Sequence, residues 1–427
     1  MEITFENVTL NGKVTTKPVY EDLKRYLICT LFSDKYSTIN NVLLDKETKE
    51  ILDILKALGA NITIKEYKGK RKTLKVKGSY PFDTETEEID LKDNLNLLKS
   101  FAPILFISKK KFQYKYKNVI ISNPINSFYN LFFKKGFTKV QMEKNEYPIK
   151  IQSGISKSVF YIRSDIKKEY LSTILSLLPK AYKTSKVIIL GGEIEDKSYI
   201  KRTIEILKDF EVDVKNNNFK EFEITNASYE PCNIKIENDY TTAGLWITAS
   251  ALGHKIMVKD LNLKSKQQNK KILNILKVIG IKILANKNGD IIARPNKISA
   301  FNIDISKVPD LLPYLAVIAS VADGTSKLKN ADSIYINDIS LAKEMVHAIN
   351  SIGGDSFLFG GDLIIKGREM LKGGKVDNIS LHEVIFALCA VSRQSLMPIK
   401  VQVPTSMPRY YKEFYRDFNR LGRKKFI

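Results

Sequence analysis

The stretch KEILDILKALGANITI, residues 49–64, decides the fold class of this chain. Its apolar residues Ile51, Ile54 and Leu58 recur with helical spacing and therefore define one buried face. Gly59 follows directly, and a glycine at this point readily adopts the left-handed conformation that ends a helix. The alternating run NITI after it is typical of a strand. The stretch thus predicts a helix, a glycine-marked turn and a strand.

The same pattern recurs six times, with turn positions spaced by roughly 70–77 residues, which is longer than a solenoid repeat. These positions are Gly59, Gly136, Glu211, Gly280, Gly353 and Gly422. A second helical pattern, apolar nearly all round as in buried helices, lies between successive turns. These second patterns begin at Asp22, Asp93, Lys167, Thr241, Asp310 and Leu381.

Six helix–strand units predict an α/β protein that either closes as one barrel or divides into three units plus three. The second helix in each unit favours the division. We therefore expect an α/β fold of two domains with three units per domain. In it, the apolar helices lie inside and the one-sided, lysine-rich helices face solvent.

Composition narrows the class of protein. The 427 residues carry a formal charge of +22, which favours anionic ligands, from phosphorylated metabolites to nucleic acid. No stretch of 18 residues is free of charge, so we expect no membrane span. The three cysteines lack the spacing of a disulfide framework or a zinc site, and the N-terminus is unlike a signal peptide. We expect a cytoplasmic protein without a metal or cofactor.

Two segments, residues 65–78 and 109–117, are the densest in lysine. The second interleaves Phe112, Tyr114 and Tyr116 with lysines, as a strand that stacks bases beside phosphate contacts would. The alternative is a pair of edge strands whose lysines discourage pairing with other sheets. The sequence leaves both interpretations open.

The alternation of inner and outer helices, together with ISKVPDLLPYLAVIASVADGTSKLKNA (305–331) and LIIKGREMLKGGKVD (363–377), resembles the enolpyruvyl transferases. Segment by segment the chain is most similar to the EPSP synthase family, from Phe5 to Gly422. The resemblance implies a two-domain, inside-out α/β barrel with six repeated helix–strand units, three per domain. Its two lobes would be residues 14–235 and residues 1–13 with 236–427. The resemblance also implies hinges near residues 13–17 and 232–240.

The resemblance implies transfer of the enolpyruvyl group of phosphoenolpyruvate to the 5-hydroxyl of shikimate 3-phosphate, by a monomer without a cofactor, in aromatic amino acid biosynthesis. Asp310, in PDLLP, aligns with the family's proposed base, and a helix-capping aspartate is the alternative. The positions that align with substrate-binding residues are Lys17, Lys24, Arg25, Lys99, Lys167, Lys168, Glu169, Asn337, His382 and Arg409.

Several of these positions depart from the family pattern. Ile334 and Ile336 stand where the family has an arginine and a lysine, and Glu383 replaces an arginine that binds phosphoenolpyruvate. Lys99 keeps the charge of an arginine but loses its bidentate fork. Lys167 and Lys168 form either a phosphate site or a solvated basic turn.

Three functions follow from these observations. The first is enolpyruvyl transfer to shikimate 3-phosphate with substituted cations. The second is a diverged or catalytically inactive relative that binds another anion or partner. The third is a nucleic-acid binder that uses the basic surface.

Overall fold

The computed structural model describes residues 2–82, 84, 86, 88–92, 94–107, 112–115, 149–151, 159–181, 184–194, 196–336, 338–402 and 412–422. By its internal contacts the chain divides into two compact units. Unit 1 consists of Met1–Lys17 and Glu237–Ile427, and unit 2 is Pro18–Ile236. Each unit encloses its own hydrophobic core. The sequence-based division placed the boundaries slightly earlier, after residues 13 and 235.

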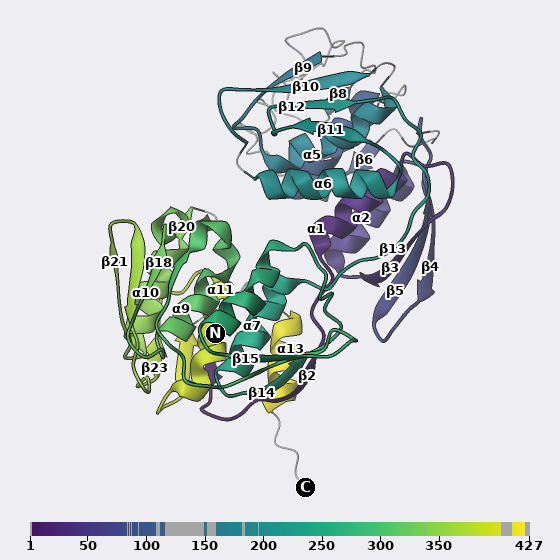
Figure 1. Cartoon of the computed structure of the whole chain (residues 1–427). Coiled ribbons are helices and arrows are strands. Elements are labelled where there is room, and N and C mark those ends of the chain that lie inside the picture. Colours follow the sequence, from purple (N-terminus) through teal and green to yellow (C-terminus); the bar gives the residue numbers. More distant parts are fainter. Residues whose placement is uncertain are drawn as a thin grey trace. The chain divides into compact units, whose positions relative to one another are not determined.

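Six inner helices form, and five of them follow the apolar pattern, whereas the first also carries the charged run EDLKR. They are α1 (Tyr20–Thr30), α3 (Leu95–Phe101), α5 (Lys168–Leu177), α7 (Tyr240–Ala251), α9 (Leu312–Ala319) and α11 (His382–Val391). Every residue of α9 is buried, as a helix without a polar face requires. In unit 1, α7, α9 and α11 contact one another, and Figure 1 shows them in the middle of that unit. In unit 2, α5 contacts both α1 and α3.

The outer helices bury one face only. They are α2 (Lys46–Ala57), α6 (Lys197–Asp209), α8 (Ile272–Val278), α10 (Leu341–Ser351) and α13 (Lys412–Gly422). In α2 the predicted apolar residues Ile51, Ile54 and Leu55 are buried, whereas Lys49 and Asp53 are exposed. The remaining expected outer helix, around residues 127–142, lies outside the described residues. The predicted α/β class with repeated inner and outer helices is confirmed.

The turns after four outer helices share one geometry. The backbone angle φ is 89° at Gly59, 61° at Glu211, 100° at Gly280 and 83° at Gly353. In each turn the next residue donates its N–H to the carbonyl five residues back, as Ala60 does to Leu55 at 2.9 Å. Glu211 therefore takes a left-handed conformation that costs an ordinary residue about 1 kcal/mol.

The expected turn at Gly422 is wrong, because the helical hydrogen-bonding pattern of α13 continues through this residue. Gly136 lies outside the described residues. The repeat is therefore seen directly at four of its six predicted turns.

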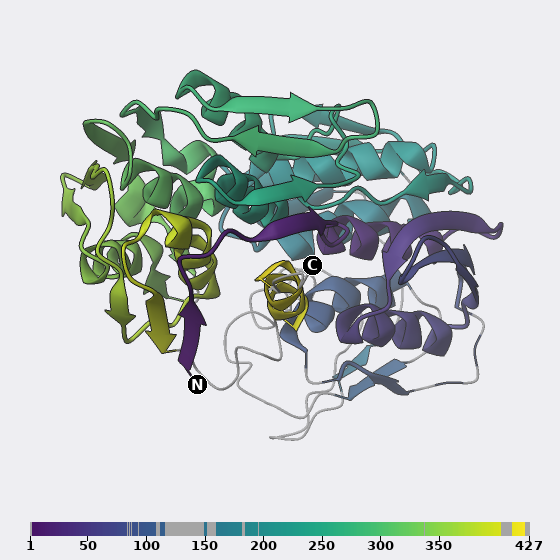
Figure 2. The ribbon, with the colours of Figure 1, turned by 90° about the horizontal axis from the view of Figure 1, so that it is seen from below.

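The strands of unit 1 form three larger sheets and a two-stranded ribbon. The sheet orders are β1-β24-β23, β15-β16-β14-β2, β17-β18-β22-β21 and β19-β20. The strands are β1 (Glu2–Phe5), β2 (Asn11–Val14), β14 (Lys255–Val258), β15 (Lys282–Ala285), β16 (Ile291–Arg294), β17 (Asn302–Asp304), β18 (Thr325–Lys329), β19 (Tyr335–Ile336), β20 (Ile339–Ser340), β21 (Asp355–Phe359), β22 (Asp362–Lys366), β23 (Gly374–Val376) and β24 (Ile399–Gln402). Figure 2 shows the purple N-terminal strand β2 alongside β14, with which it pairs in parallel.

The described residues of unit 2 form three sheets, in the orders β11-β12-β10-β9, β13-β3-β5-β4 and β6-β7-β8. The strands are β3 (Ser37–Leu43), β4 (Asn61–Glu66), β5 (Arg71–Lys77), β6 (Glu88–Asp90), β7 (Phe112–Lys115), β8 (Ile149–Ile151), β9 (Val159–Arg163), β10 (Ser185–Leu190), β11 (Val214–Asn217), β12 (Glu221–Ile224) and β13 (Asn233–Lys235).

The expectation that the two lysine-rich segments form a pair of edge strands is wrong. The strand residues of the first segment lie in β5, apart from Lys65 and Glu66 at the end of β4, and those of the second lie in β7. β4 lies at the edge of its sheet, whereas β5 lies between β3 and β4 and points Leu74 and Val76 into the core. β7 pairs with strands on both sides, so it is not an edge strand. In the described part of the chain, no helix combines the length and apolar character needed to span a bilayer.

Candidate active site

Helix α1 carries charges into the interior of unit 2. Its sequence EDLKR places Glu21 three residues before Lys24, and Asp22 three residues before Arg25. The Nζ atom of Lys24 lies 2.9 Å from Oε2 of Glu21, and Nη1 of Arg25 lies 3.0 Å from Oδ1 of Asp22. The side chains of Asp22, Lys24 and Arg25 are all at least nine-tenths buried. Buried charges of this kind are tolerated because each is paired within one helical turn.

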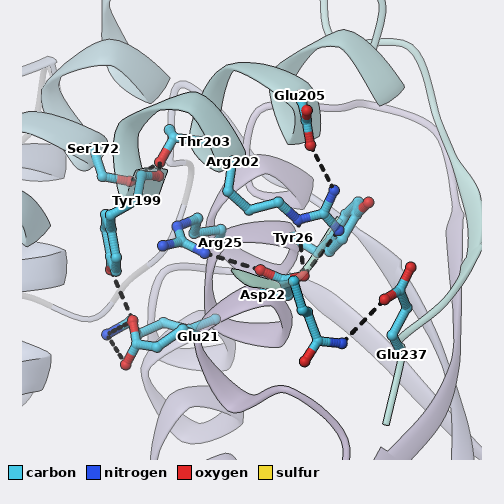
Figure 3. A network of polar contacts seen from close by, with 12 residues as sticks. Glu21, Asp22, Arg25, Tyr26, Ser172, Tyr199, Arg202, Thr203, Glu205 and Glu237 are labelled. Carbon is cyan, nitrogen blue, oxygen red and sulfur yellow. Dashed lines mark hydrogen bonds and ion pairs between the residues drawn. The ribbon is translucent and has the colours of Figure 1, made fainter. Parts of the chain in front are cut away.

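Helix α6 supplies further partners for both carboxylates (Figure 3). The Tyr199 hydroxyl donates to Glu21 at 2.7 Å. The Arg202 guanidinium lies 2.8 Å from Asp22, and 3.3 Å from Glu205 on its own helix. Asp22 is therefore shared by two guanidinium groups, from α1 and from α6.

Helix α5 adds Lys168 to this group of side chains. Lys168 forms an ion pair of 2.9 Å with Asp196, the residue that caps the N-terminus of α6. Burial alone would lower the pKa of Lys168, but its hydrogen bond to Asp196 and the charge of that carboxylate raise the pKa overall. The Lys168 ammonium lies 5.1 Å from the ring centre of Tyr199, and the Arg25 guanidinium lies 3.7 Å from it. The structure thus brings together three predicted site residues, Lys24, Arg25 and Lys168.

We call these residues the α1 cluster. Its four cations are Lys24, Arg25, Lys168 and Arg202, and its four carboxylates are Glu21, Asp22, Asp196 and Glu205. Four positive and four negative charges give a formal sum of zero. The cluster is therefore neutral inside a chain whose formal charge is +22.

The Glu21 carboxyl is held in its ionised form. Partial desolvation by the neighbouring side chains would by itself raise its pKa, but the charges of Lys24 and Arg25 and the hydrogen bonds from Lys24 and Tyr199 lower the pKa to about 2. For Tyr199, burial and the nearby negative charge of Glu21 raise the pKa well above its ordinary value. The pair therefore consists of a neutral phenol that donates and a carboxylate that accepts.

The other predicted binding residues lie elsewhere or outside the described residues. Lys17 belongs to unit 1, where its carbonyl accepts a hydrogen bond of 2.7 Å from the Asp239 N–H. Lys99 lies in the last turn of α3, and Lys167 and Glu169 flank Lys168 at the start of α5. Asn337 and Arg409 are outside the described residues.

Asp310, the predicted base, lies in unit 1 within the short turn η5 (Pro309–Leu311). The side-chain amide of Asn269 donates to Oδ2 of Asp310 at 2.8 Å and to the Thr241 hydroxyl oxygen at 2.7 Å. Asp310 is exposed, so its carboxylate is both anchored and accessible. The expected helix cap at this position is wrong: α9 begins at Leu312 and its N-cap residue is Leu311, because the turn η5 precedes the helix.

His382 lies in the first turn of α11. Its Nε2 atom is 2.8 Å from Oε1 of the neighbouring Glu383, and its ring packs edge-on against Phe386 at 5.5 Å. Glu383, which replaces the family's arginine, thus lies beside the imidazole ring of His382. Within the described residues, no group of three or more histidine, cysteine and acidic side chains is placed to hold a metal ion.

Three residues that the structure places in the site were not predicted from the sequence: Glu21, Tyr199 and Asn269. The sequence could have indicated Glu21, because an acidic residue three positions before a lysine on a helix lies next to that lysine. No sequence pattern indicates Tyr199 or Asn269, since each contacts its partner only in the folded tertiary structure.

Two units of inner helices, outer helices and small sheets define the fold of the enolpyruvyl transferases. The chain belongs to the EPSP synthase (3-phosphoshikimate 1-carboxyvinyltransferase) family, whose sequence profile matches residues 6–418.

Known proteins agree with this assignment. The 3-phosphoshikimate 1-carboxyvinyltransferase of Clostridium novyi is 30% identical over 418 residues, covering 97% of this chain and 95% of the relative. That of Clostridium kluyveri is 29% identical over 421 residues, covering 98% and 97%. EPSP synthase from Acinetobacter baumannii superposes with a TM-score of 0.80 at 14% identity, covering 99% and 98%. The enolpyruvyl transferase NikO from Streptomyces tendae gives 0.70 at 15% identity, covering 99% and 97%.

Proposed function

We propose that this protein transfers the enolpyruvyl group of phosphoenolpyruvate to the 5-hydroxyl of shikimate 3-phosphate. The observation that carries the proposal is the family match along nearly the whole chain, with the aligned base Asp310 present and anchored by Asn269. As part of the same proposal, the protein acts as a cytoplasmic monomer without a cofactor.

The reaction has two steps. In the first, the 5-hydroxyl oxygen bonds to C2 of phosphoenolpyruvate, the hydroxyl proton leaves, and C3 gains a proton to become a methyl group. In the second, the bond between C2 and the phosphate oxygen breaks, the methyl group loses a proton, and inorganic phosphate departs. In this proposal Asp310 accepts the proton of the 5-hydroxyl, because its exposed carboxylate can form a hydrogen bond to the hydroxyl group of shikimate 3-phosphate.

Substrate anions need cations, and the aligned residues supply them. Lys24, Arg25 and Lys168 of the α1 cluster take the shikimate phosphate in this proposal. The residues assigned to the remaining substrate contacts are Lys17, Lys99, Lys167, Glu169, Asn337, His382 and Arg409. A charge-assisted hydrogen bond to phosphate contributes about 1.5–3 kcal/mol, so the loss of even one of these cations would weaken binding measurably.

The second candidate function is that of an inactive relative that binds an anion without turnover. Two specific observations favour it. Ile334 and Ile336, at the family's cationic positions, pack against the hydrophobic core of unit 1. The cations of the α1 cluster are already paired with carboxylates. Both features lower the affinity for phosphorylated substrates relative to a site with free cations.

Phosphate release from a mixture of phosphoenolpyruvate and shikimate 3-phosphate separates the two functions. We expect turnover, and we expect Asp310→Asn to reduce it at least a hundredfold while leaving the fold intact. Asp323→Asn is the matched control, since it removes the same charge from an exposed pair with Lys297 in the same unit. Calorimetric binding of shikimate 3-phosphate without any phosphate release would favour the inactive relative. An unchanged rate in Asp310→Asn would remove this residue from the mechanism.

A further inference from the structure

We propose that the Glu21 carboxylate is a built-in competitor for the anion site formed by Lys24 and Tyr199, so that an anionic ligand must displace it to bind there. The inference rests on the proposed function in one respect: it takes the α1 cluster as the place where a phosphate or carboxylate group of the substrate would bind.

The geometry around Glu21 is that of an occupied anion site. The Lys24 ammonium lies 2.9 Å from Oε2 and 3.1 Å from Oε1, and the Tyr199 hydroxyl donates to Oε2 at 2.7 Å. An ammonium and a hydroxyl converging on one carboxylate make charge-assisted hydrogen bonds. A phosphate oxygen accepts from the same donors, so the site is built for an anion and already holds one.

Exposure decides which partner can leave. The Lys24 side chain is 2% exposed and the Glu21 side chain 42% exposed, so water reaches Glu21 but hardly reaches Lys24. A half-exposed carboxylate regains hydration when it swings outward, whereas buried Lys24 has no such alternative. Displacement of Glu21 by an incoming anion is therefore the exchange that costs least.

The other carboxylates of the cluster are fixed more firmly. Asp22 is 7% exposed and held by Arg25 and Arg202 together. Asp196 caps α6 by accepting the Tyr199 N–H at 3.0 Å in addition to pairing with Lys168. Glu205, the fourth carboxylate, pairs with Arg202 and not with Lys24. Glu21 has neither constraint and is the carboxylate paired with Lys24, so it is the displaceable counter-ion of this site.

The test compares phosphate binding by the full-length protein and its variants. Calorimetric titration with inorganic phosphate, and separately with shikimate 3-phosphate, is made on wild type, Glu21→Gln and Glu193→Gln. Glu193→Gln is the control because it removes the same charge from an exposed pair with Lys197 in the same unit. We expect Glu21→Gln to lower the Kd for phosphate at least tenfold and Glu193→Gln to leave it unchanged.

The double variant Glu21→Gln/Lys24→Met locates the effect. We expect it to lose the gain in affinity, because the ammonium that binds the anion is gone while the buried volume is kept. Equal phosphate affinity in wild type and Glu21→Gln overturns the proposal, as does a gain that survives Lys24→Met. If Glu21→Gln does not fold, Glu21→Asp provides the same test, since its shorter side chain reaches Lys24 less well and phosphate should bind more tightly.

Failure of this inference is distinguishable from failure of the proposed function. A phosphate affinity that rises in Glu21→Gln, without product from phosphoenolpyruvate and shikimate 3-phosphate in either protein, supports the competitor and removes the transferase. Turnover by wild type with no change in phosphate affinity on Glu21→Gln does the reverse.

Discussion

The Nδ1 atom of His254 accepts a hydrogen bond of 3.0 Å from the backbone N–H of Leu10, a residue 244 positions away in the sequence. The carbonyl of Leu10 in turn accepts from the Lys255 N–H at 2.8 Å. These two bonds fasten the chain just before β2 to the turn between α7 and β14. The imidazole must be neutral to accept at Nδ1, so the N-terminal segment of unit 1 depends on the protonation state of one histidine.

The stability of unit 1 should fall as the pH drops from 6.5 to 4. Burial, followed by the charge of Arg393, lowers the pKa of His254 from 6.5 to about 4. The unfolded chain therefore takes up the proton at a higher pH than the folded chain does. The contribution of neutral His254 to the free energy of unfolding is fully present above pH 6.5 and is lost as the pH falls towards 4, by about 3 kcal/mol at most. Urea unfolding at several pH values measures this slope. His254→Gln should flatten it, whereas His347→Gln, at an exposed histidine, should not. Parallel slopes in wild type and His254→Gln would contradict the assignment.

Asp22→Asn should destabilise unit 2. The substitution removes the charge that Arg25 and Arg202 share in a buried setting, and breaking a buried ion pair from one side costs about 3 kcal/mol or more. The urea midpoint is the measurement. The control is Glu230→Gln, which opens an exposed pair with Lys35 and should not move the midpoint. Equal midpoints in all three proteins would mean that Asp22 contributes no net stability.

Asn269→Ala should lower kcat about tenfold with little change in KM, if Asp310 is the base. The amide of Asn269 holds the carboxylate of Asp310 and the hydroxyl of Thr241 in one place, and lost positioning acts mainly on the transition state. Steady-state kinetics with both substrates test this. A rise in KM at constant kcat would instead assign Asn269 to substrate binding.

Gly353→Ala should destabilise the turn after α10 more than Gly69→Ala destabilises the tip of the β4–β5 hairpin. Both glycines have positive φ, at 83° and 59°, so either alanine carries the left-handed penalty of about 1 kcal/mol. At Gly353 the new Cβ would also lie 2.8 Å from Cβ and Cγ of Lys372, whereas at Gly69 it meets nothing within 4 Å. Unfolding midpoints of the two variants would show the difference. Equal losses in the two variants would mean that the close contact at Gly353 is relieved without cost.

Sequence patterns predicted the repeated elements because those patterns act over short distances. The apolar residues of α9 and the glycines after α2, α8 and α10 are each recognisable within a dozen residues. The same reasoning was wrong at Gly422, which still belongs to helix α13, and for Asp310 as a helix cap, where a short turn precedes α9. Helix ends depend on neighbouring contacts, so the pattern locates them less well than the helices themselves.

Lys24, Arg25, Lys168 and Asp310 of the candidate site were named from the sequence, but their partners and electrostatic state were not. The run EDLKR contains both short-range ion pairs of α1 and could have shown that Lys24 and Arg25 are not free cations. The bond from Tyr199 to Glu21 spans 178 residues, and that from Asn269 to Asp310 spans 41. No local pattern encodes such partners, because packing selects them when distant segments meet. The repeated α/β units follow from the sequence, because the periodicity that defines them is local. The neutral α1 cluster and the anchored Asp310 follow from the tertiary structure, because hydrogen bonds depend on which side chains folding brings within reach.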